Sequence, residues 1–438
     1  MMNSALLRLV PLWLLLFSLL GCRKIQNPNP DLGREGRTKS FLFFNYKIIP
    51  DPGRLGLDNE QSNQGRDPER LFVGQQLHLF AREGTIPYEV LRRFRNETGA
   101  DVVMTTFHDS IEMYNRLRSG QTCDVMMPTN YIVKRLIEEE MLADVEWDLI
   151  PNRSNVEEDF HGLDYDSRGE YTIAYLWTLV GIAYHRDYFD DRPDSWKEFF
   201  EPGENVAPFV RNKTAMIPLA RENFAAVLLR LGYSPNTEDP KEIDAATLYL
   251  REKFSLLKLG TEKELEESFI NGTVVMAQLT GADVARMANP DVIFSVPQEG
   301  VWKRFDVFAI SSKASALKKR LAASFINFML QPGVAAAVSD HSYHATTLRG
   351  ARAFVRASIR QSSSYINANE EITYVLDTSG PLEAHIEEVW RDMRSLAQPL
   401  ITPKERAPAS LPTPSGPQPG WSVADEPATV SPTQPAAP

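Results

Sequence analysis

The sequence contains few of the residues that carry redox, metal or catalytic chemistry. Only two cysteines, Cys22 and Cys123, occur in 438 residues, which excludes a framework of several disulfides. The seven histidines form no HExxH pattern and no close cluster with cysteine, and Walker, GxSxG and dinucleotide-binding motifs are absent. We therefore expect no enzyme, no catalytic residues, no metal site and no cofactor.

Basic residues are also too few for a nucleic-acid-binding protein. The 47 bases are outnumbered by 58 acids, so the formal net charge is −11. Binding to phosphates requires a basic face, and this charge therefore argues against nucleic acid as a partner. The length fits two domains, and the 43% hydrophobic and 24% charged residues are ordinary for a soluble globular body.

Cys22 ends an apolar segment that begins near Leu9 and follows Arg8. The segment is shorter than the roughly 20 residues that span a bilayer, and it has the order of a bacterial secretory signal. Its end, Leu-Leu-Gly-Cys, resembles a lipobox, in which the cysteine is diacylated. We predict a signal peptide over 1–21, lipidation at Cys22 and export to the periplasm or cell surface with a membrane anchor. The alternative is an ordinary cleaved signal with an incidental cysteine.

Two polar segments flank the predicted globular body. We expect a lipid-anchored tether over 22–71, in which the apolar island Phe41–Phe44 could be a strand or a docking patch. We expect a Pro-rich disordered tail over 401–438, because such a composition cannot bury a core. No other segment is apolar enough to cross a membrane. Cys123 lies in a short apolar run that reads as a buried strand, so we expect it to be a small core residue rather than a reactive thiol.

The body opens with alternating strand and helix patterns, which predict an α/β fold with parallel strands. Strands are expected at 77–80, 102–104 and 125–127, with helices between Pro87 and Gly99 and from a capping box at Asp109–Glu112 to Gly120. The loops at 81–85, 105–109 and 128–131 should gather at one sheet edge, where ligands bind. Later elements are predicted as an extended segment over 171–184, helices from Glu222 and Glu262, a strand over 274–279 and a helix over 317–330.

Several collinear stretches resemble the spermidine/putrescine-binding proteins of ABC transporters. They are Leu91–Gly99, Cys123–Tyr131, Tyr171–Trp177, Arg221–Glu222 with Leu231–Thr237, and Phe325–Pro332. The resemblance covers nearly all of 76–400. It implies a type II periplasmic-binding-protein fold, with two α/β lobes joined by crossing strands and closing on a ligand in the cleft. Lobe 1 would comprise 72–180 and about 305–345, and lobe 2 about 181–304 and 346–400.

The function implied by the resemblance is capture of a small polar solute, with putrescine, spermidine or a related amine as candidates, for an ABC permease in the inner membrane. The alternative is a sensor or surface lipoprotein whose diverged cleft binds a zwitterionic or anionic solute. An enzyme on this scaffold has no support in the sequence.

The resemblance assigns ligand-binding positions, and most of their acids are retained. Glu222, Asp283 and Asp306 stand where the family has acids, while Thr129 and Tyr131 keep the hydroxyl and the aromatic ring of its Pro turn. Each has a simpler interpretation. Glu222 would be a first-turn helix acid, Asp283 and Asp306 solvated loop acids, and Tyr131 a packing residue.

Five positions depart from the family pattern. Arg82, Thr85 and Thr280 replace aromatics, Arg304 replaces another aromatic, and Leu219 replaces an acid. The predicted cleft therefore loses its aromatic box and gains two guanidinium groups. These arginines are expected either to form ion pairs with the retained acids or to bind a carboxylate or phosphate of the ligand through two hydrogen bonds. For Arg82, a position in solvent beside Glu83 is the simpler alternative.

Overall fold

The computed structural model of the chain describes residues 72–202, 210, 212–365, 373–374, 381–397 and 400, all within the unit Pro68–Pro438. The predicted signal peptide, the lipidation site Cys22, the tether and the Pro-rich tail lie outside the described residues. Among the described residues, no single helix has the length and hydropathy to cross a membrane. The bent pair Ala316–Met329 and Pro332–Ser342 meets the test only when both helices are taken together.

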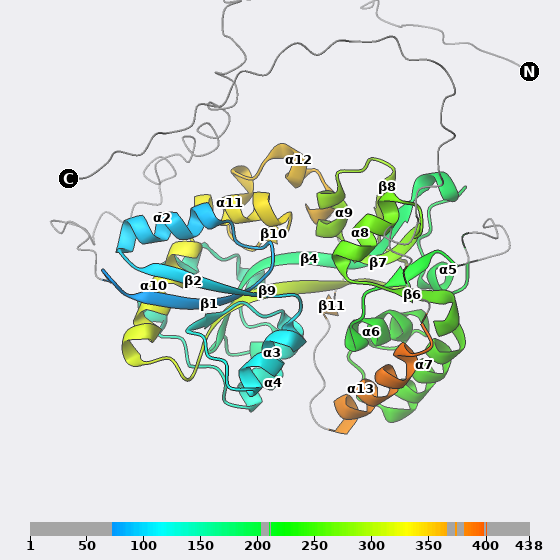
Figure 1. Ribbon diagram of the computed structural model, residues 1–438, viewed down its shortest axis with the longest axis horizontal. Helices are drawn as coiled ribbons and strands as arrows, with labels where there is room; N and C mark the ends of the chain where they lie inside the picture. Colours follow the sequence, from blue (N-terminus) through cyan, green and yellow to red (C-terminus); the bar gives the residue numbers. More distant parts are fainter. Residues whose placement is uncertain are drawn as a thin grey trace, which may run out of the picture. The chain divides into compact units, whose positions relative to one another are not determined.

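Three parallel strands form the sheet of the first lobe, as the sequence predicts. A helix follows each of them in the chain, and Figure 1 shows α2 on one face of this sheet and α3 and α4 on the other. The elements are β1 (Gln76–Arg82), α2 (Tyr88–Thr98), β2 (Asp101–Phe107), α3 (Ser110–Arg118), β3 (Val125–Met126) and α4 (Val133–Glu138).

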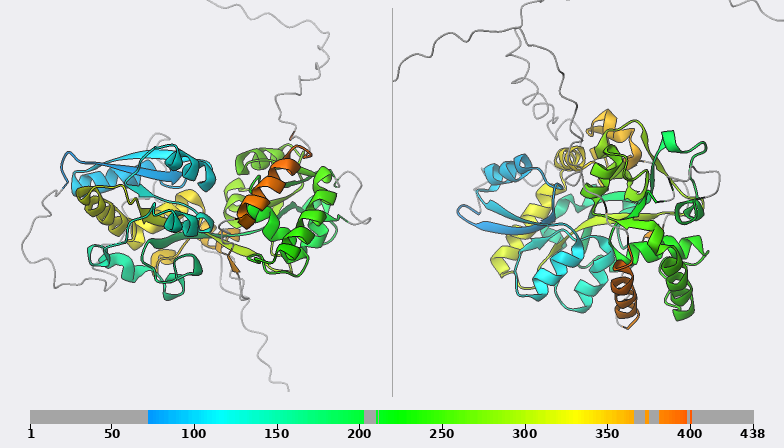
Figure 2. Two further views of the ribbon diagram at one scale, coloured as in Figure 1. Left: turned by 90° about the horizontal axis from the view of Figure 1, so that it is seen from below. Right: turned by 45° about the vertical axis from the view of Figure 1, so that its right-hand side comes forward.

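Two long strands run from the first lobe into the second. β4 (Thr172–His185) and β9 (Trp302–Ile310) pair antiparallel at the centre of one continuous sheet, ordered β2-β1-β3-β9-β4-β7-β5-β6. Figures 1 and 2 show the helices of each lobe gathered at opposite ends of these strands. The crossing strands predicted from the sequence are therefore present, and they continue the sheet instead of merely linking two domains.

The second lobe again alternates strands and helices. β5 pairs parallel with β6 and β7, and β7 pairs antiparallel with β4. The elements are α5 (Trp196–Phe200), β5 (Thr214–Met216), α6 (Ala220–Arg230), α7 (Pro240–Lys253), β6 (Leu257–Leu259), α8 (Glu262–Ile270), β7 (Met276–Thr280), α9 (Gly281–Met287) and β8 (Val292–Ser295).

The C-terminal part returns to both lobes. α10 and α11 lie with the first lobe, β10 pairs with β4, α12 lies near α9 through the short helical turn Ser363–Tyr365, and α13 lies against α6 and α7. The bounds are α10 (Ala316–Met329), α11 (Pro332–Ser342), β10 (Ala345–Thr346), α12 (Ala357–Arg360), β11 (Thr373–Tyr374) and α13 (Pro381–Arg394). The lobe boundaries predicted above remain our proposal.

Local sequence signals explain where the first helices begin and end. Gly99 ends α2 with φ of 78°, a left-handed conformation that glycine adopts without penalty. Asp109 caps α3 by accepting a hydrogen bond from the backbone N–H of Glu112 at 2.8 Å. The predicted capping box is wrong in one respect. The Glu112 carboxylate accepts from the N–H of His108 instead of closing back on Asp109.

Aromatic residues dominate the cores of both lobes. In the first, Phe94 of α2 packs edge-on against Phe325 of α10 at a centroid distance of 5.1 Å. In the second, Trp196 stacks on Trp302 at 5.8 Å and is fully buried. Burying a side chain of this size contributes roughly 1.5–3 kcal/mol, so these contacts hold the layers that carry the cleft. Cys123 is also buried, as predicted, and its burial raises the pKa of its thiol to about 12.

Candidate solute-binding cleft

The carboxyl ends of four strands, β1, β2, β6 and β7, meet around one open cavity of about 850 Å³. On the side of the first lobe it is bordered by the segment after β1, including Arg82 and Thr85, and by His108 after β2. On the other side stand the first turns of α8 and α9, which follow β6 and β7. In α/β sheets, ligands bind outside the carboxyl ends of the strands, and the topology therefore predicts a ligand site here.

The walls of this cleft are rich in carboxylates. Six carboxylates and three cationic side chains line it, an excess of three negative charges. The acids are Glu83, Glu262, Glu264, Glu266, Glu267 and Asp283, and the cations are Arg82, Lys263 and Arg286. Four of the acids come from the first two turns of α8, and the positive end of the helix dipole favours the two in its first turn, Glu262 and Glu264.

Glu222 and Arg304 form a buried, two-pronged ion pair. Arg304 donates from Nε to Oε1 of Glu222 at 3.0 Å and from Nη2 to Oε2 at 2.7 Å, and each side chain is only 4% exposed. A third contact joins Arg304 to Glu262 at 3.4 Å. Burial lowers the pKa of Arg304, but the charges of Glu222 and Glu262 outweigh this and raise it above its usual range. Glu222 is thus both a first-turn acid of α6 and the counterion of an internal guanidinium.

Arg82 of β1 is held by one charged and one neutral acceptor. Its Nη2 lies 3.1 Å from Oδ2 of Asp306 on β9 and 2.7 Å from Nε2 of His344. Burial and the charge of Arg82 lower the pKa of His344 to about 4, so its imidazole is neutral near pH 7. The alternative position of Arg82 in solvent beside Glu83 is wrong, since its side chain is 15% exposed and paired across the sheet.

Asp283 is saturated by contacts within its own helix. One carboxylate oxygen accepts from the N–H and the hydroxyl of Thr280 at 3.0 and 2.6 Å, and the other from Arg286 at 2.6 Å. Arg286 also pairs with Glu266. Burial raises the pKa of Asp283, but Arg286 and Thr280 outweigh it and lower the pKa to about 2. The capping box Thr280–Asp283 explains these two residue types without a ligand.

The turn after β3 is fastened to the crossing strand. Thr129 forms an isolated bridge with Asp306, and its hydroxyl lies 2.6 Å from that of Ser110. Thr129 and Tyr131 line a small inner cavity of about 20 Å³, which holds about one water, together with Arg82, Arg304 and Asp306. Tyr131 is buried, and it packs with the hydrophobic core as the simpler interpretation predicts.

The predicted site residues are therefore close together, but their roles differ from a plain acidic box. The open cleft is lined by Arg82, Thr85 and Asp283. The inner cavity is lined by Thr129, Tyr131, Arg304 and Asp306. Neither cavity is lined by Glu222 or Thr280. The prediction that the arginines pair with retained acids is confirmed. The alternative of solvated acids is wrong, because Asp283 and Asp306 are buried.

Sequence reasoning missed His344, Arg286 and the acidic face of α8. The acids could have been found, because Glu262–Glu267 holds four carboxylates at a predicted helix start. That segment follows the short strand β6, which the pattern did not predict. No local signal marks His344, which reaches Arg82 across 262 positions of sequence.

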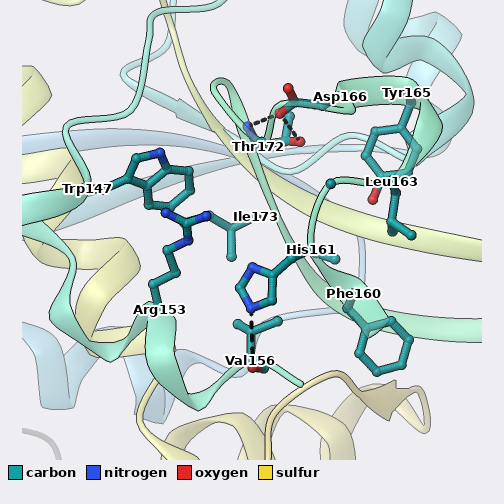
Figure 3. A pocket seen from close by; sticks show the side chains of 13 residues that line it. Trp147, Arg153, Val156, Phe160, His161, Leu163, Tyr165, Asp166, Thr172 and Ile173 are labelled. Atoms are coloured by element: carbon teal, nitrogen blue, oxygen red, sulfur yellow. Dashed lines mark hydrogen bonds between the residues drawn. The ribbon is translucent and has the colours of Figure 1, made fainter. Parts of the chain in front are cut away.

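Two other features of the described residues do not form part of the cleft. Figure 3 shows a cavity of about 20 Å³ in which Arg153 stacks on Trp147 at 3.8 Å and Asp166 accepts from Thr172. It has room for about one water. His185, Asp187 and Asp291 place possible metal ligands within 4.8 Å of one another, but Arg186 already pairs with Asp291 at 2.7 Å. The absence of a metal cofactor therefore stays a prediction.

A two-lobed α/β fold with a polar cleft at the strand ends is typical of solute-binding proteins. Residues 89–354 match the model of the family described as bacterial extracellular solute-binding protein. This match spans more than half of the chain, and the chain therefore belongs to that family.

Individual relatives agree with this assignment. The spermidine/putrescine-binding periplasmic protein of Escherichia coli is 29% identical over 260 residues, 58% of this chain and 72% of the relative. The putrescine-binding periplasmic protein SpuD of Pseudomonas aeruginosa is 27% identical over 326 residues, 70% and 88% of the two chains. The structure of the spermidine/putrescine ABC transporter substrate-binding protein PotD from Streptococcus pneumoniae has a TM-score of 0.64 at 22% identity, covering 74% of this chain and 99% of its own.

These findings confirm the predicted resemblance and the two-lobed type II fold. The description of the family as extracellular also agrees with the predicted export of the protein.

Proposed function

We propose that this chain is the solute-binding lipoprotein of an ABC importer, which captures a small polar solute carrying an amino group and delivers it to a permease in the inner membrane. The anchor would be the acylated Cys22, and the protein itself would perform no chemistry. The observation that carries the proposal is the cleft of about 850 Å³ at the strand ends of both lobes, with its excess of carboxylates.

Capture would follow from closure of the lobes about β4 and β9. A solute that touches both walls stabilises the closed form by its differential affinity for the two states. Polyamines are one class of candidate, because ammonium groups form charge-assisted hydrogen bonds with carboxylates. The names of the relatives support this class.

A second candidate is a sensor or surface lipoprotein whose diverged cleft takes a zwitterionic or anionic solute. It is favoured by one specific observation: Glu222, Asp283 and Asp306 are each already paired with an internal arginine. A dication would have to displace these guanidinium groups or bind elsewhere in the cleft.

The test is native mass spectrometry of the purified full chain, followed by uptake measurements with the solute that co-purifies. If the protein serves an importer, deleting its gene should abolish uptake of that solute, and the full chain should restore it. Unchanged uptake in the deletion strain would reject the importer and favour the sensor.

A further inference from the structure

We propose that the cleft selects a zwitterion, a small ω-amino acid whose carboxylate binds Arg82 and whose ammonium group binds the acidic wall of α8, and that His344 positions Arg82 for this contact. The inference rests on the proposed function, because it names the class of solute for the same cleft.

The two walls of the cleft differ in charge, because most of the carboxylates stand on the side of the second lobe. On the side of the first lobe, the cation at the end of β1 is Arg82, which is partly exposed and paired with Asp306, and the nearby Glu83 is exposed and paired with His108 at 3.4 Å. On the side of the second lobe, α8 presents four carboxylates. Arg82 and Glu262 each line both the open cleft and the inner cavity, so they border the same space. A zwitterion bridges such walls, whereas a dication brings one ammonium group against Arg82.

Arg82 retains capacity to bind an anion. Its side chain is 15% exposed, and both recorded hydrogen bonds involve Nη2 alone. Among the described residues, its Nε has no hydrogen-bond partner although the atom is buried. An unpaired buried donor is unfavourable. Because Asp306 and His344 take both hydrogens of Nη2, a ligand carboxylate would accept single charge-assisted hydrogen bonds from the remaining donors of the guanidinium. A ligand carboxylate at this position would therefore complete the bonding of Arg82.

His344 determines where the guanidinium points. Its Nδ1 lies 2.9 Å from the carbonyl oxygen of Ser342, which can only accept, so Nδ1 carries the proton and Nε2 is left as an acceptor for Arg82. The ring is 4% exposed, and the charged groups near it are Arg82, Asp306 and Asp283. A neutral acceptor holds Arg82 without cancelling its charge, which leaves more positive potential for the ligand than a second carboxylate would.

The opposite wall suits an ammonium group. Glu262 and Glu266 lie one turn apart on α8, and their side chains are 29% and 21% exposed. Their contacts with Arg304 and Arg286 leave these partly exposed oxygens able to accept further bonds. Glu222, by contrast, is only 4% exposed and lines neither cavity, so a ligand amine reaches α8 first.

The test compares matched ligands by calorimetric titration of the full chain. γ-Aminobutyrate and putrescine have the same four-carbon backbone and differ in one end group, and three- to six-carbon pairs extend the series. We expect at least one amino acid of the series to bind tenfold more tightly than its matched diamine. Arg82→Met should weaken that amino acid at least tenfold and leave or improve diamine binding. Arg251→Met, an exposed arginine on α7 outside both cavities, should change neither.

The role of His344 has its own control. His344→Leu should reduce the preference for amino acid over diamine, and His344→Gln should restore most of it, because the amide oxygen accepts a hydrogen bond from Arg82. If His344 only supports the fold, His344→Leu will weaken both ligands equally.

If no amino acid of the series binds more tightly than its matched diamine, the zwitterion proposal is overturned and the importer function is left standing. Failure of the entire amino acid series to bind also overturns it, and the uptake test then decides the importer function separately.

Discussion

Loss of Arg304 alone should destabilise the protein far more than loss of the whole buried pair. Arg304 and Glu222 are each 4% exposed and are joined by two hydrogen bonds of 3.0 and 2.7 Å. Arg304→Met leaves the Glu222 carboxylate buried without its main counterion, which typically costs about 3–5 kcal/mol. The double variant Glu222→Leu, Arg304→Met removes both charges, and replacing a buried pair by apolar residues is often neutral or stabilising.

The assay is urea unfolding, followed by circular dichroism and tryptophan fluorescence. Coincidence of the two transitions licenses a single free energy of unfolding for this two-lobed chain. Arg95→Met is the matched control, because the Arg95–Asp101 pair has a similar 3.0 Å contact but is 61% and 44% exposed. An exposed pair of this kind contributes less than about 1 kcal/mol.

In Arg304→Met, the space left by the guanidinium group can take up an added amine, which should restore part of the lost stability. Added putrescine should stabilise Arg304→Met by up to about 2.7 kcal/mol at a hundredfold excess over its Kd, and should have much less effect on the natural chain. If Arg304→Met loses less than about 1 kcal/mol, or the double variant is as unstable as the single one, Arg304 is not the main counterion of the buried Glu222 carboxylate.

Three further predictions address separate parts of the chain. Cys22→Ser should release the protein into the soluble fraction, and the natural chain should incorporate labelled palmitate; an unlabelled natural chain would end the lipoprotein proposal. Because folding lowers the pKa of His344 to about 4 from 6.5, its neutral form adds stability that is complete above pH 6.5 and lost as the pH falls toward 4, roughly 3 kcal/mol in all. His344→Gln should therefore flatten the dependence of unfolding free energy on pH in this range, and an unchanged slope would show that other groups dominate. Cys123, whose burial raises its thiol pKa to about 12, should resist iodoacetamide at pH 8 until urea unfolds the chain, whereas rapid native labelling would contradict its burial.

The alternating elements of the first lobe could be predicted because each depends on neighbouring residues. Helical spacing of Val90, Leu91 and Phe94 with Gly99 at the end defines α2, and the structure follows this pattern. The sequence pattern did not predict β6, because a strand of three residues is too short to show an alternation of polar and apolar side chains. The predicted strand over 274–279 is present as β7, which begins at Met276. The side chain of Glu112 accepts from the N–H of His108 at 2.8 Å, one residue before the position that a capping box uses.

The sequence by itself determined the α/β alternation, the set of charged residues near the strand ends and the exchange of aromatics for arginines. These follow from local periodicity and from residue identity at each position. Which acid each arginine neutralises was decided only by the tertiary structure, because the partners are far apart in the chain. Arg82 reaches Asp306 across 224 positions, and Arg304 reaches Glu222 across 82. Asp306 and Arg304 both lie on the crossing strand β9, which places them beside their partners on β1 and α6. The sheet, rather than any sequence motif, therefore determines which charged groups remain available to a solute.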